Sequence, residues 1–347
     1  MKNFFKAVVV DIAIILDAIK GFVITTLVIA AIIISLSAVI HNVFKIREIY
    51  SEDKTGYKNL VTVDDNRLNL KVFGEGEKTI VILSSFANPS PIVQYKPYTE
   101  RLVENGYKVV VIEYFGYGYS LSTKSTRNVG YFIHEINEAL TSAEIFEKCT
   151  FLANGVSGIY ASAYANTFPD SVEKLILVDS IYPATINEEF ISKQIENQKL
   201  NIVLTHYAEA TGYARILSYV YPKAFSIDKM EELGFAPIDI KVYRKMIANR
   251  FYTGAMKNEY KLLSENMEQF KNYKFPDYLP TLQILSNGYV EEYENYKANN
   301  QIKNGIKDYA EGLITNQDIQ KVVVVDGERE NLNLTNPDAV ISQIIND

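Results

Sequence analysis

Histidine is the usual base for nucleophilic catalysis near neutral pH, and this chain of 347 residues contains only three, His41, His134 and His206. Any mechanism that needs an imidazole base must therefore use one of these side chains. The single cysteine can form neither an internal disulfide nor a zinc cluster. No group of histidine, cysteine and carboxylate residues has metal-ligand spacing, and no phosphate-binding loop of the form G-x-x-x-x-G-K-[ST] occurs. We therefore expect neither a metal nor another cofactor.

A serine nucleophile would need a sharp turn that exposes its hydroxyl. Gly155-Val156-Ser157 matches the first half of the motif G-x-S-x-G, but Ile159 occupies the position of the second small residue. We interpret Ser157 first as a small residue that lets a helix pack closely on a strand, and only then as a nucleophile. Asp179, which follows the apolar run LILV, either caps the next turn or substitutes for a catalytic acid.

Short runs rich in Val, Ile and Leu alternate with longer amphipathic segments over residues 59–347. The runs predict strands at residues 60–63, 68–73, 79–83, 108–113, 149–153, 175–179, 282–285 and 321–325. The amphipathic segments predict helices at about residues 95–105, 130–147, 156–167, 290–312 and 337–346. Continuous runs such as IVIL are typical of strands covered on both faces, so we expect an α/β domain with a mostly parallel sheet between helices. Residues 183–276 show no strand pattern and predict a helical cap, a lid inserted over one end of the sheet.

An uncharged apolar run, GFVITTLVIAAIIISLSAVI, occupies residues 21–40. As a helix it would span roughly 30 Å, the thickness of the hydrocarbon core of a bilayer. We expect one transmembrane helix in an N-terminal anchor at residues 1–44, a signal anchor rather than a cleaved signal peptide, and then a linker at residues 45–58. His41 would then lie at the membrane interface. Basic residues flank the run on both sides, so the positive-inside rule does not choose its orientation.

The loops after the expected strands resemble those of the α/β-hydrolase superfamily over about residues 60–345. In that family a strand leads into a small-x-nucleophile-x-small turn and then a helix with alanines, a proline and a valine at fixed positions. Counted from Gly155, these positions hold Ala161, Ala165, Pro169 and Val172, and the run EYFGYGYS resembles the family's D-x-R-G-x-G-x-S turn. The closest resemblance is to membrane-attached hydrolase-like proteins of low-GC Gram-positive bacteria. It implies an α/β-hydrolase fold with a helical lid.

The same register puts Gly155 where the family has its serine nucleophile and Asn154 where a histidine often precedes it. The family's histidine lies seven residues before the proline that opens the last helix, and this position holds Glu330. Glycine has no side chain and cannot form an acyl-enzyme. The resemblance therefore implies a degenerate catalytic triad, for which Ser157 and Asp179 are the fallback residues.

The family's oxyanion loop commonly carries His-Gly where this chain has Ser84-Ser85. The resemblance implies that the backbone amides of Phe86 and Val156 could still bind an anion. The residues expected to contact a ligand are Ser85, Phe86, Asn154, Val156 and Tyr182.

Three functions fit these patterns. The first is a membrane-anchored, hydrolase-like protein that lacks serine-hydrolase catalysis and binds a small apolar or acyl ligand or a partner protein. The second is an ester or acyl hydrolase that uses Ser157, Glu330 or His206, and the third is a structural scaffold at the membrane. A net charge of −7 argues against a nucleic-acid partner. The resemblance and the near absence of cysteine favour the cell membrane, with the globular domain outside the cytoplasm.

Overall fold

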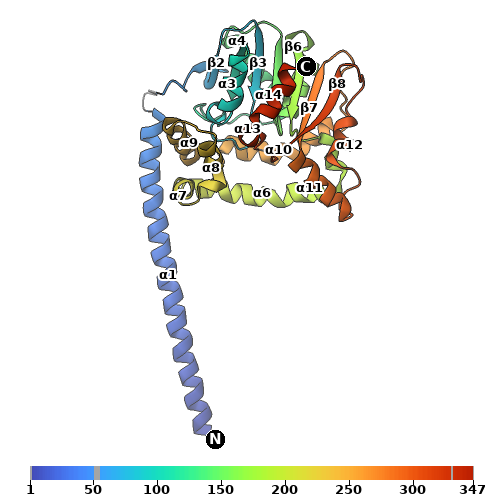
Figure 1. Ribbon diagram of the computed structural model, residues 1–347. Helices are drawn as coiled ribbons and strands as arrows, with labels where there is room; N and C mark the ends of the chain where they lie inside the picture. Colours follow the sequence, from blue (N-terminus) through green and yellow to red (C-terminus); the bar gives the residue numbers. More distant parts are fainter. Residues whose placement is uncertain (1, 51–54, 330, 347) are drawn as a thin grey trace.

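The computed structural model describes residues 2–50, 55–329 and 331–346, and its globular part is built on one sheet of eight strands (Figure 1). The order across the sheet is β1-β2-β4-β3-β5-β6-β7-β8. The strands are β1 (Leu60–Val63), β2 (Asn66–Phe73), β3 (Lys78–Leu83), β4 (Tyr107–Glu113), β5 (Cys149–Asn154), β6 (Val172–Val178), β7 (Thr281–Ser286) and β8 (Gln320–Val325). β2 is antiparallel to both β1 and β4, and the other pairings are parallel. The prediction of a mostly parallel sheet is confirmed.

Helices cover both faces of the sheet, which explains the continuous apolar runs in the sequence. In β4, Val110 and Ile112 belong to the core shared with α4 and α5, whereas Val109 and Val111 belong to the core shared with α3 and α14. The helices outside the cap and the N-terminal segment are α2 (Pro91–Gln94), α3 (Lys96–Glu104), α4 (Val129–Ser142), α5 (Ser157–Thr167), η1 (Pro169–Ser171), α11 (Asn287–Ala298), α12 (Ile306–Glu311), α13 (Leu332–Thr335) and α14 (Pro337–Ile345). The single helix expected at 290–312 is instead two helices, α11 and α12, because the chain turns at Asn300, where φ is +57°.

The segment between β6 and β7 forms a cap of helices at the carboxyl ends of the strands (Figure 1). Its elements are η2 (Pro183–Asn187), α6 (Glu189–Glu209), α7 (Tyr213–Val220), η3 (Pro222–Phe225), α8 (Ile227–Glu232), α9 (Pro237–Arg250) and α10 (Gly254–Phe270). Part of the cap shares an apolar cluster with the rest of the domain, in which Ile227 and Met230 of α8 and Ile247 of α9 join Val93 of α2 and Leu334 of α13. The cap is therefore anchored by packing and not only by its two connections to the sheet.

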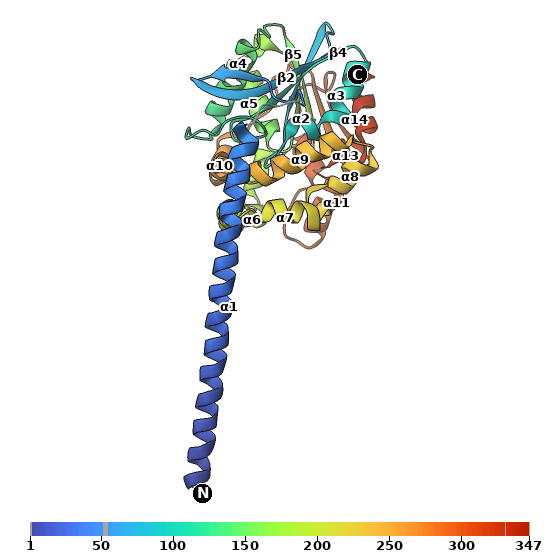
Figure 2. The same ribbon diagram turned by 90° about the vertical axis from the view of Figure 1, so that its left-hand side faces the viewer.

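Helix α1 (Lys2–Tyr50) extends far from the globular part (Figures 1 and 2). Its stretch Ile15–Glu48 is long and apolar enough to cross a membrane, and its most apolar window has a mean hydropathy of 2.8 and is not buried. No second helix of this kind occurs among the described residues.

The last turns of α1 correct the expectation of a linker at residue 45 and show a contact at His41. Residues 45–50, expected to begin a linker, are helical, and Lys45 forms an ion pair of 2.9 Å with Glu209 of the cap. His41, expected at the membrane interface, is buried against Gly212, where a Cβ atom would lie 2.8 Å from the Cβ of His41. The cap thus binds the end of α1 through partners that are distant in sequence.

Candidate functional site

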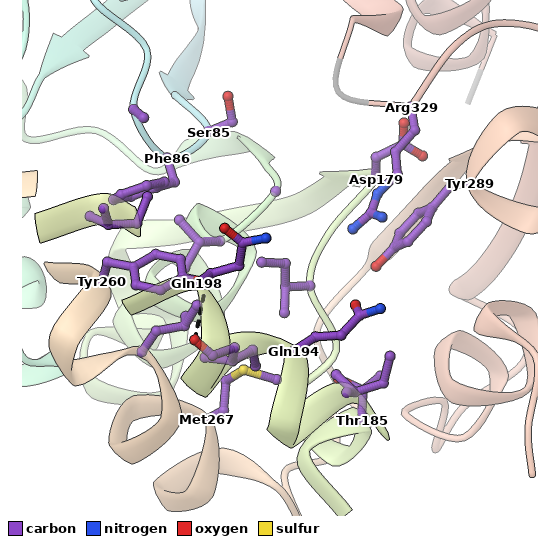
Figure 3. Close-up of a pocket in the computed structure, with 18 of the residues that line it drawn as sticks. Ser85, Phe86, Asp179, Thr185, Gln194, Gln198, Tyr260, Met267, Tyr289 and Arg329 are labelled. Carbon is purple, nitrogen blue, oxygen red and sulfur yellow. Dashed lines mark hydrogen bonds between the residues drawn. The ribbon is translucent and has the colours of Figure 1, made fainter. Parts of the chain in front are cut away.

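A cavity of about 390 Å³ lies between the strand ends and the cap. The loops after β3, β5, β6 and β8 line it with Ser85, Phe86, Gly155, Val156, Asp179 and Arg329. Cap helices α6 and α10 add Gln194, Gln198, Tyr260 and Met267, which Figure 3 labels. The carboxyl ends of parallel strands are the usual place for ligands in α/β sheets, so this cavity is the candidate site.

The turn after β5 places a glycine at the cavity. Gly155 has a φ of +56°, a conformation that glycine adopts at little cost, and its N–H donates to the carbonyl of Val178 over 3.1 Å. A Cβ atom at Gly155 would lie 3.2 Å from the Cβ of Ser85 across the cavity wall. The sharp strand–turn–helix geometry is present, but this position contributes no side-chain atom that could act as a nucleophile.

Ser157 does not line this cavity. Its side chain is fully buried, its hydroxyl donates to the carbonyl of Ser84 over 2.5 Å, and it lies 3.1 Å from the hydroxyl of Tyr114. These contacts fix the start of α5 against the loop after β3. Ser157 therefore packs the start of α5, as the sequence suggested, and a substrate in the cavity cannot reach its hydroxyl.

The residues expected to contact a ligand divide into two groups. Ser85, Phe86 and Val156 line the cavity. Asn154 is buried at the end of β5, where its amide donates to the carbonyl of Leu83 over 3.3 Å. Tyr182 lies in the loop after β6 but does not line the cavity, and burial raises the pKa of its hydroxyl. The structure therefore brings together three of the five.

Asp179 lies at one end of the cavity with Tyr289 and Arg329 (Figure 3). Its φ is +43°, and its carboxylate accepts the N–H of Ser286 over 2.7 Å, which ties the ends of β6 and β7 together. The guanidinium of Arg329 lies 4.1 Å from the ring centre of Tyr289 and pairs with Glu292. This end of the cavity is thus polar and charged. The neighbouring Glu330, expected at the histidine position, lies outside the described residues.

Glu259 of α10 is a cavity residue that the sequence reading missed. It is buried, and the hydroxyls of Tyr117 and Tyr160 donate to its carboxylate over 2.7 and 2.9 Å. Burial raises the pKa of Glu259 to about 7, and the nearby Arg127 opposes this rise. The sequence does contain a pattern that could have predicted this site, because Glu259 lies on the same face of α10 as Met256 and other buried apolar residues. A carboxylate on an apolar helix face needs buried partners.

Arg127 is fully buried beside this carboxylate. It forms an ion pair with Glu135, which is also fully buried, and stacks 3.9 Å from the ring centre of Phe132. Glu135 in turn accepts the N–H of Phe115 over 2.7 Å. Two carboxylates and one guanidinium therefore share the interior next to the cavity, a costly arrangement that needs each partner.

None of the three histidines lines the cavity among the residues that the structure describes. His134 lies on α4, with its ring 2.8 Å from the carboxylate of Asp64. His206 lies on α6, with Nδ1 2.7 Å from the carbonyl of Tyr252, and burial lowers its pKa. The carbonyl contact occupies one ring nitrogen of His206 and turns it towards the start of α10.

Comparison with known proteins identifies the fold but no family. No family model matches the chain. Among solved structures, potato epoxide hydrolase I from Solanum tuberosum superposes with a TM-score of 0.58 at 17% identity, covering 83% of this chain and 97% of that one. A putative α/β hydrolase from Nostoc sp. PCC 7120 gives a TM-score of 0.60 at 15% identity, covering 83% and 96%. The chain therefore has the α/β-hydrolase fold.

Two curated proteins are similar in sequence. One is the uncharacterized protein YbdG of Bacillus subtilis (strain 168), 21% identical over 252 residues, which are 72% of this chain and 74% of YbdG. The other is 2-hydroxy-6-oxononadienedioate/2-hydroxy-6-oxononatrienedioate hydrolase 1 of Pseudomonas putida, 25% identical over 219 residues, 61% of this chain and 72% of that enzyme. Both similarities are distant.

Proposed function

We propose that this protein is a membrane-anchored member of the α/β-hydrolase fold that binds a ligand under its cap and lacks serine-hydrolase catalysis. The observation that carries the proposal is Gly155 at the turn after β5, which lines the cavity with backbone alone. Without a side chain at this turn, no acyl-enzyme can form there. The apolar helix α1 supports the membrane anchor.

The other residues that could replace the missing nucleophile and base support the same proposal. The hydroxyl of Ser157 is buried and hydrogen-bonded, and the imidazole of His206, which does not line the cavity, contacts the backbone carbonyl of Tyr252 through Nδ1. Serine catalysis needs a nucleophile and a base within hydrogen-bond reach of each other, and losing either removes most of the rate. The cavity itself favours binding over a purely structural role at the membrane.

The lining indicates the chemistry of the ligand. Apolar and aromatic side chains such as Phe86, Tyr260 and Met267 form much of the wall, whereas Asp179 and Arg329 make one end polar. The rings of Phe86 and Tyr260 lie 5.5 Å apart, so they form a continuous apolar surface. A small apolar or acyl compound with one polar end matches such a cavity.

Two measurements on the full-length protein in detergent test this proposal. A fluorophosphonate probe should label no serine, and a fluorescent fatty acid should bind. Ile195→Trp, which fills the cavity from the inner face of α6, should weaken fatty-acid binding roughly tenfold or more. Leu204→Trp, on the exposed face of the same helix, is the matched control and should leave binding unchanged. A serine labelled by the probe would show that the protein is an active serine hydrolase.

A hydrolase that uses water instead of a serine nucleophile is the second candidate. Glu259 favours it, because this carboxylate reaches the cavity with a pKa of about 7, where a general base is effective. Ester hydrolysis that persists in Ser157→Ala and Glu330→Gln but falls at least tenfold in Glu259→Gln would support this candidate. Hydrolysis unchanged in all three variants would eliminate these residues as catalytic groups.

A further inference from the structure

Large apolar side chains cover the outer face of the cap where α6 meets α7. They are Leu200, Leu204, Tyr207, Ile216, Val220 and Tyr221, each between 57% and 75% exposed. We call this set the outer cap face. Single exposed apolar residues are ordinary, but a group on two neighbouring helices marks an interaction surface.

The two sides of α6 show that this exposure is directional. Ile191, Ile195 and Ile202 recur at helical spacing on one side and line the cavity. Leu200 and Leu204 lie on the opposite side and are exposed. A helix that is apolar on both sides needs a second apolar surrounding, and the described part of the chain supplies only the inner one.

Helix α1 is fixed to the same corner of the cap. The hydroxyl of Ser37 donates to the carbonyl of Thr211 over 2.6 Å, in the turn between α6 and α7. Eleven residues further along α1, Glu48 accepts two hydrogen bonds from the guanidinium of Arg215, of 2.9 and 2.7 Å, and one of 2.7 Å from Asn249. These contacts span several turns of α1 and so hold it in one direction relative to the cap.

That direction places the outer cap face towards the bilayer. In both views, α6 and α7, together with the end of α11, form the edge of the globular part on the side towards which α1 extends (Figures 1 and 2). The uncharged run at residues 21–40 spans roughly 30 Å as a helix, which matches the hydrocarbon thickness of a bilayer, and its residues 21–36 are all exposed. The first contact with the cap, at Ser37, follows immediately. The turn at Thr211 therefore lies at the membrane boundary.

We infer that the outer cap face rests on the lipid bilayer that α1 enters, with Leu204 and Val220 among the acyl chains near the headgroups. Apolar residues at this depth are stabilised by burial in the interface, as in helices that lie along a membrane. The cavity beneath α6 is then held next to the lipid surface. The inference rests on the membrane anchor of the proposed function, but not on the ligand or on the loss of catalysis.

The chain contains no tryptophan, so single-tryptophan variants report on one position each. Full-length Val220→Trp and Leu204→Trp would be reconstituted into phosphatidylcholine vesicles, with and without brominated acyl chains. Emission from both should be blue-shifted, and brominated lipid should quench it roughly twofold or more, because bromine quenches only at contact depth. Phe146→Trp is the matched control, since Phe146 is 74% exposed in the loop before β5, at the other end of the sheet. Its emission should stay unshifted and unquenched.

Flotation of the vesicles and the near-ultraviolet circular dichroism of the tyrosines would first establish insertion and folding of each variant. A protein that does not float with the vesicles would overturn both the membrane anchor and this inference. A protein that floats while Val220→Trp and Leu204→Trp behave like Phe146→Trp would overturn the inference alone. A blue shift without quenching by brominated lipid would mean that a second copy of the chain covers the outer cap face, which also overturns it.

Discussion

The turn after β5 and the cap helix α10 line the same cavity but contribute opposite kinds of chemistry. The turn contributes Gly155, whose positive φ and close approach to Ser85 define its geometry without a side chain. Helix α10 contributes Glu259, an ionisable group held by two tyrosine hydroxyls. The backbone alone is enough to form the turn. The ionisable group of the cavity, in contrast, depends on Tyr117 and Tyr160, buried residues outside the cap that donate to Glu259.

The largest expected effect concerns the buried ion pair of Arg127 and Glu135, which lies next to Glu259. Arg127→Met should lower the free energy of unfolding by about 3–5 kcal/mol, because it leaves the buried carboxylate of Glu135 without its cation. Guanidinium denaturation of the full chain in detergent, followed by tyrosine circular dichroism, measures this loss. Lys193→Met, which breaks the exposed pair with Glu189, is the control and should change stability by less than about 1 kcal/mol. Equal effects of the two variants would mean that Arg127 does not hold the interior together.

The next effect is a pH dependence at Glu259. Its pKa is about 7 in the folded protein against 4.5 in the unfolded chain, so the folded state binds this proton more tightly. The stability that this residue contributes is fully present below about pH 4.5 and is lost as the pH rises towards 7. Glu259→Gln cannot ionise and should remove about 1–3 kcal/mol of the stability difference between pH 5 and pH 8.

The same denaturation experiment at a series of pH values tests this expectation. Glu196→Gln is a suitable control, since Glu196 is an exposed residue of α6 whose pair with Lys199 lies at the surface. Its unfolding should keep the pH dependence of the parent protein. A Glu259→Gln profile parallel to that of the parent would show that Glu259 is not the group whose ionisation destabilises the fold.

The sequence predicted the strands well because their apolar runs are covered on both faces, a local pattern with a direct structural cause. It also predicted the loop EYFGYGYS, which folds around the buried Glu113. The carboxylate of Glu113 accepts the N–H of Tyr119 over 2.7 Å, and any Cβ at Gly118 would lie 1.9 Å from that carboxylate. Residue types at fixed spacing are enough to predict this turn because the contacts of Glu113 with Gly118 and Tyr119 are local. The sequence does not predict the distant partners Asn69 and Arg250, which donate to the carboxylate of Glu113 and to the carbonyl of Gly118.

The parts that the sequence did not predict depend on distant partners. The polar segment at residues 45–58 suggested a linker, but α1 continues to Tyr50, where Glu209 and Arg215 of the cap pair with Lys45 and Glu48. Glu259 was missed because its partners Tyr117 and Tyr160 come from other elements. Asn154 and Tyr182 belong to the loops that were expected to form the site, but both are buried and neither lines the cavity. The sequence of a loop does not show which of its residues are buried and which face a cavity.

The smallest expected effect on stability tests the other side of the comparison, the backbone of the turn. Gly155→Ser should cost about 1–2 kcal/mol, because a serine at a φ of +56° is strained and its Cβ would lie 3.2 Å from the Cβ of Ser85. Gly234→Ser is the matched control, with a φ of +77° and no neighbour within 4 Å, so it carries the backbone strain alone. A larger loss at Gly155 than at Gly234 would measure the close contact across the cavity wall.

The same substitution then tests whether the turn lacks only its side chain. Combined with Glu330→His, Gly155→Ser should produce hydrolysis of a short nitrophenyl ester above that of either single variant, because it supplies both a nucleophile and a base at the positions that the resemblance assigns. A folded double variant without this activity would show that the backbone of the turn is preserved while the cavity is arranged for binding and not for acyl transfer. Activity in the parent protein, abolished by fluorophosphonate, would instead contradict the proposed loss of serine catalysis.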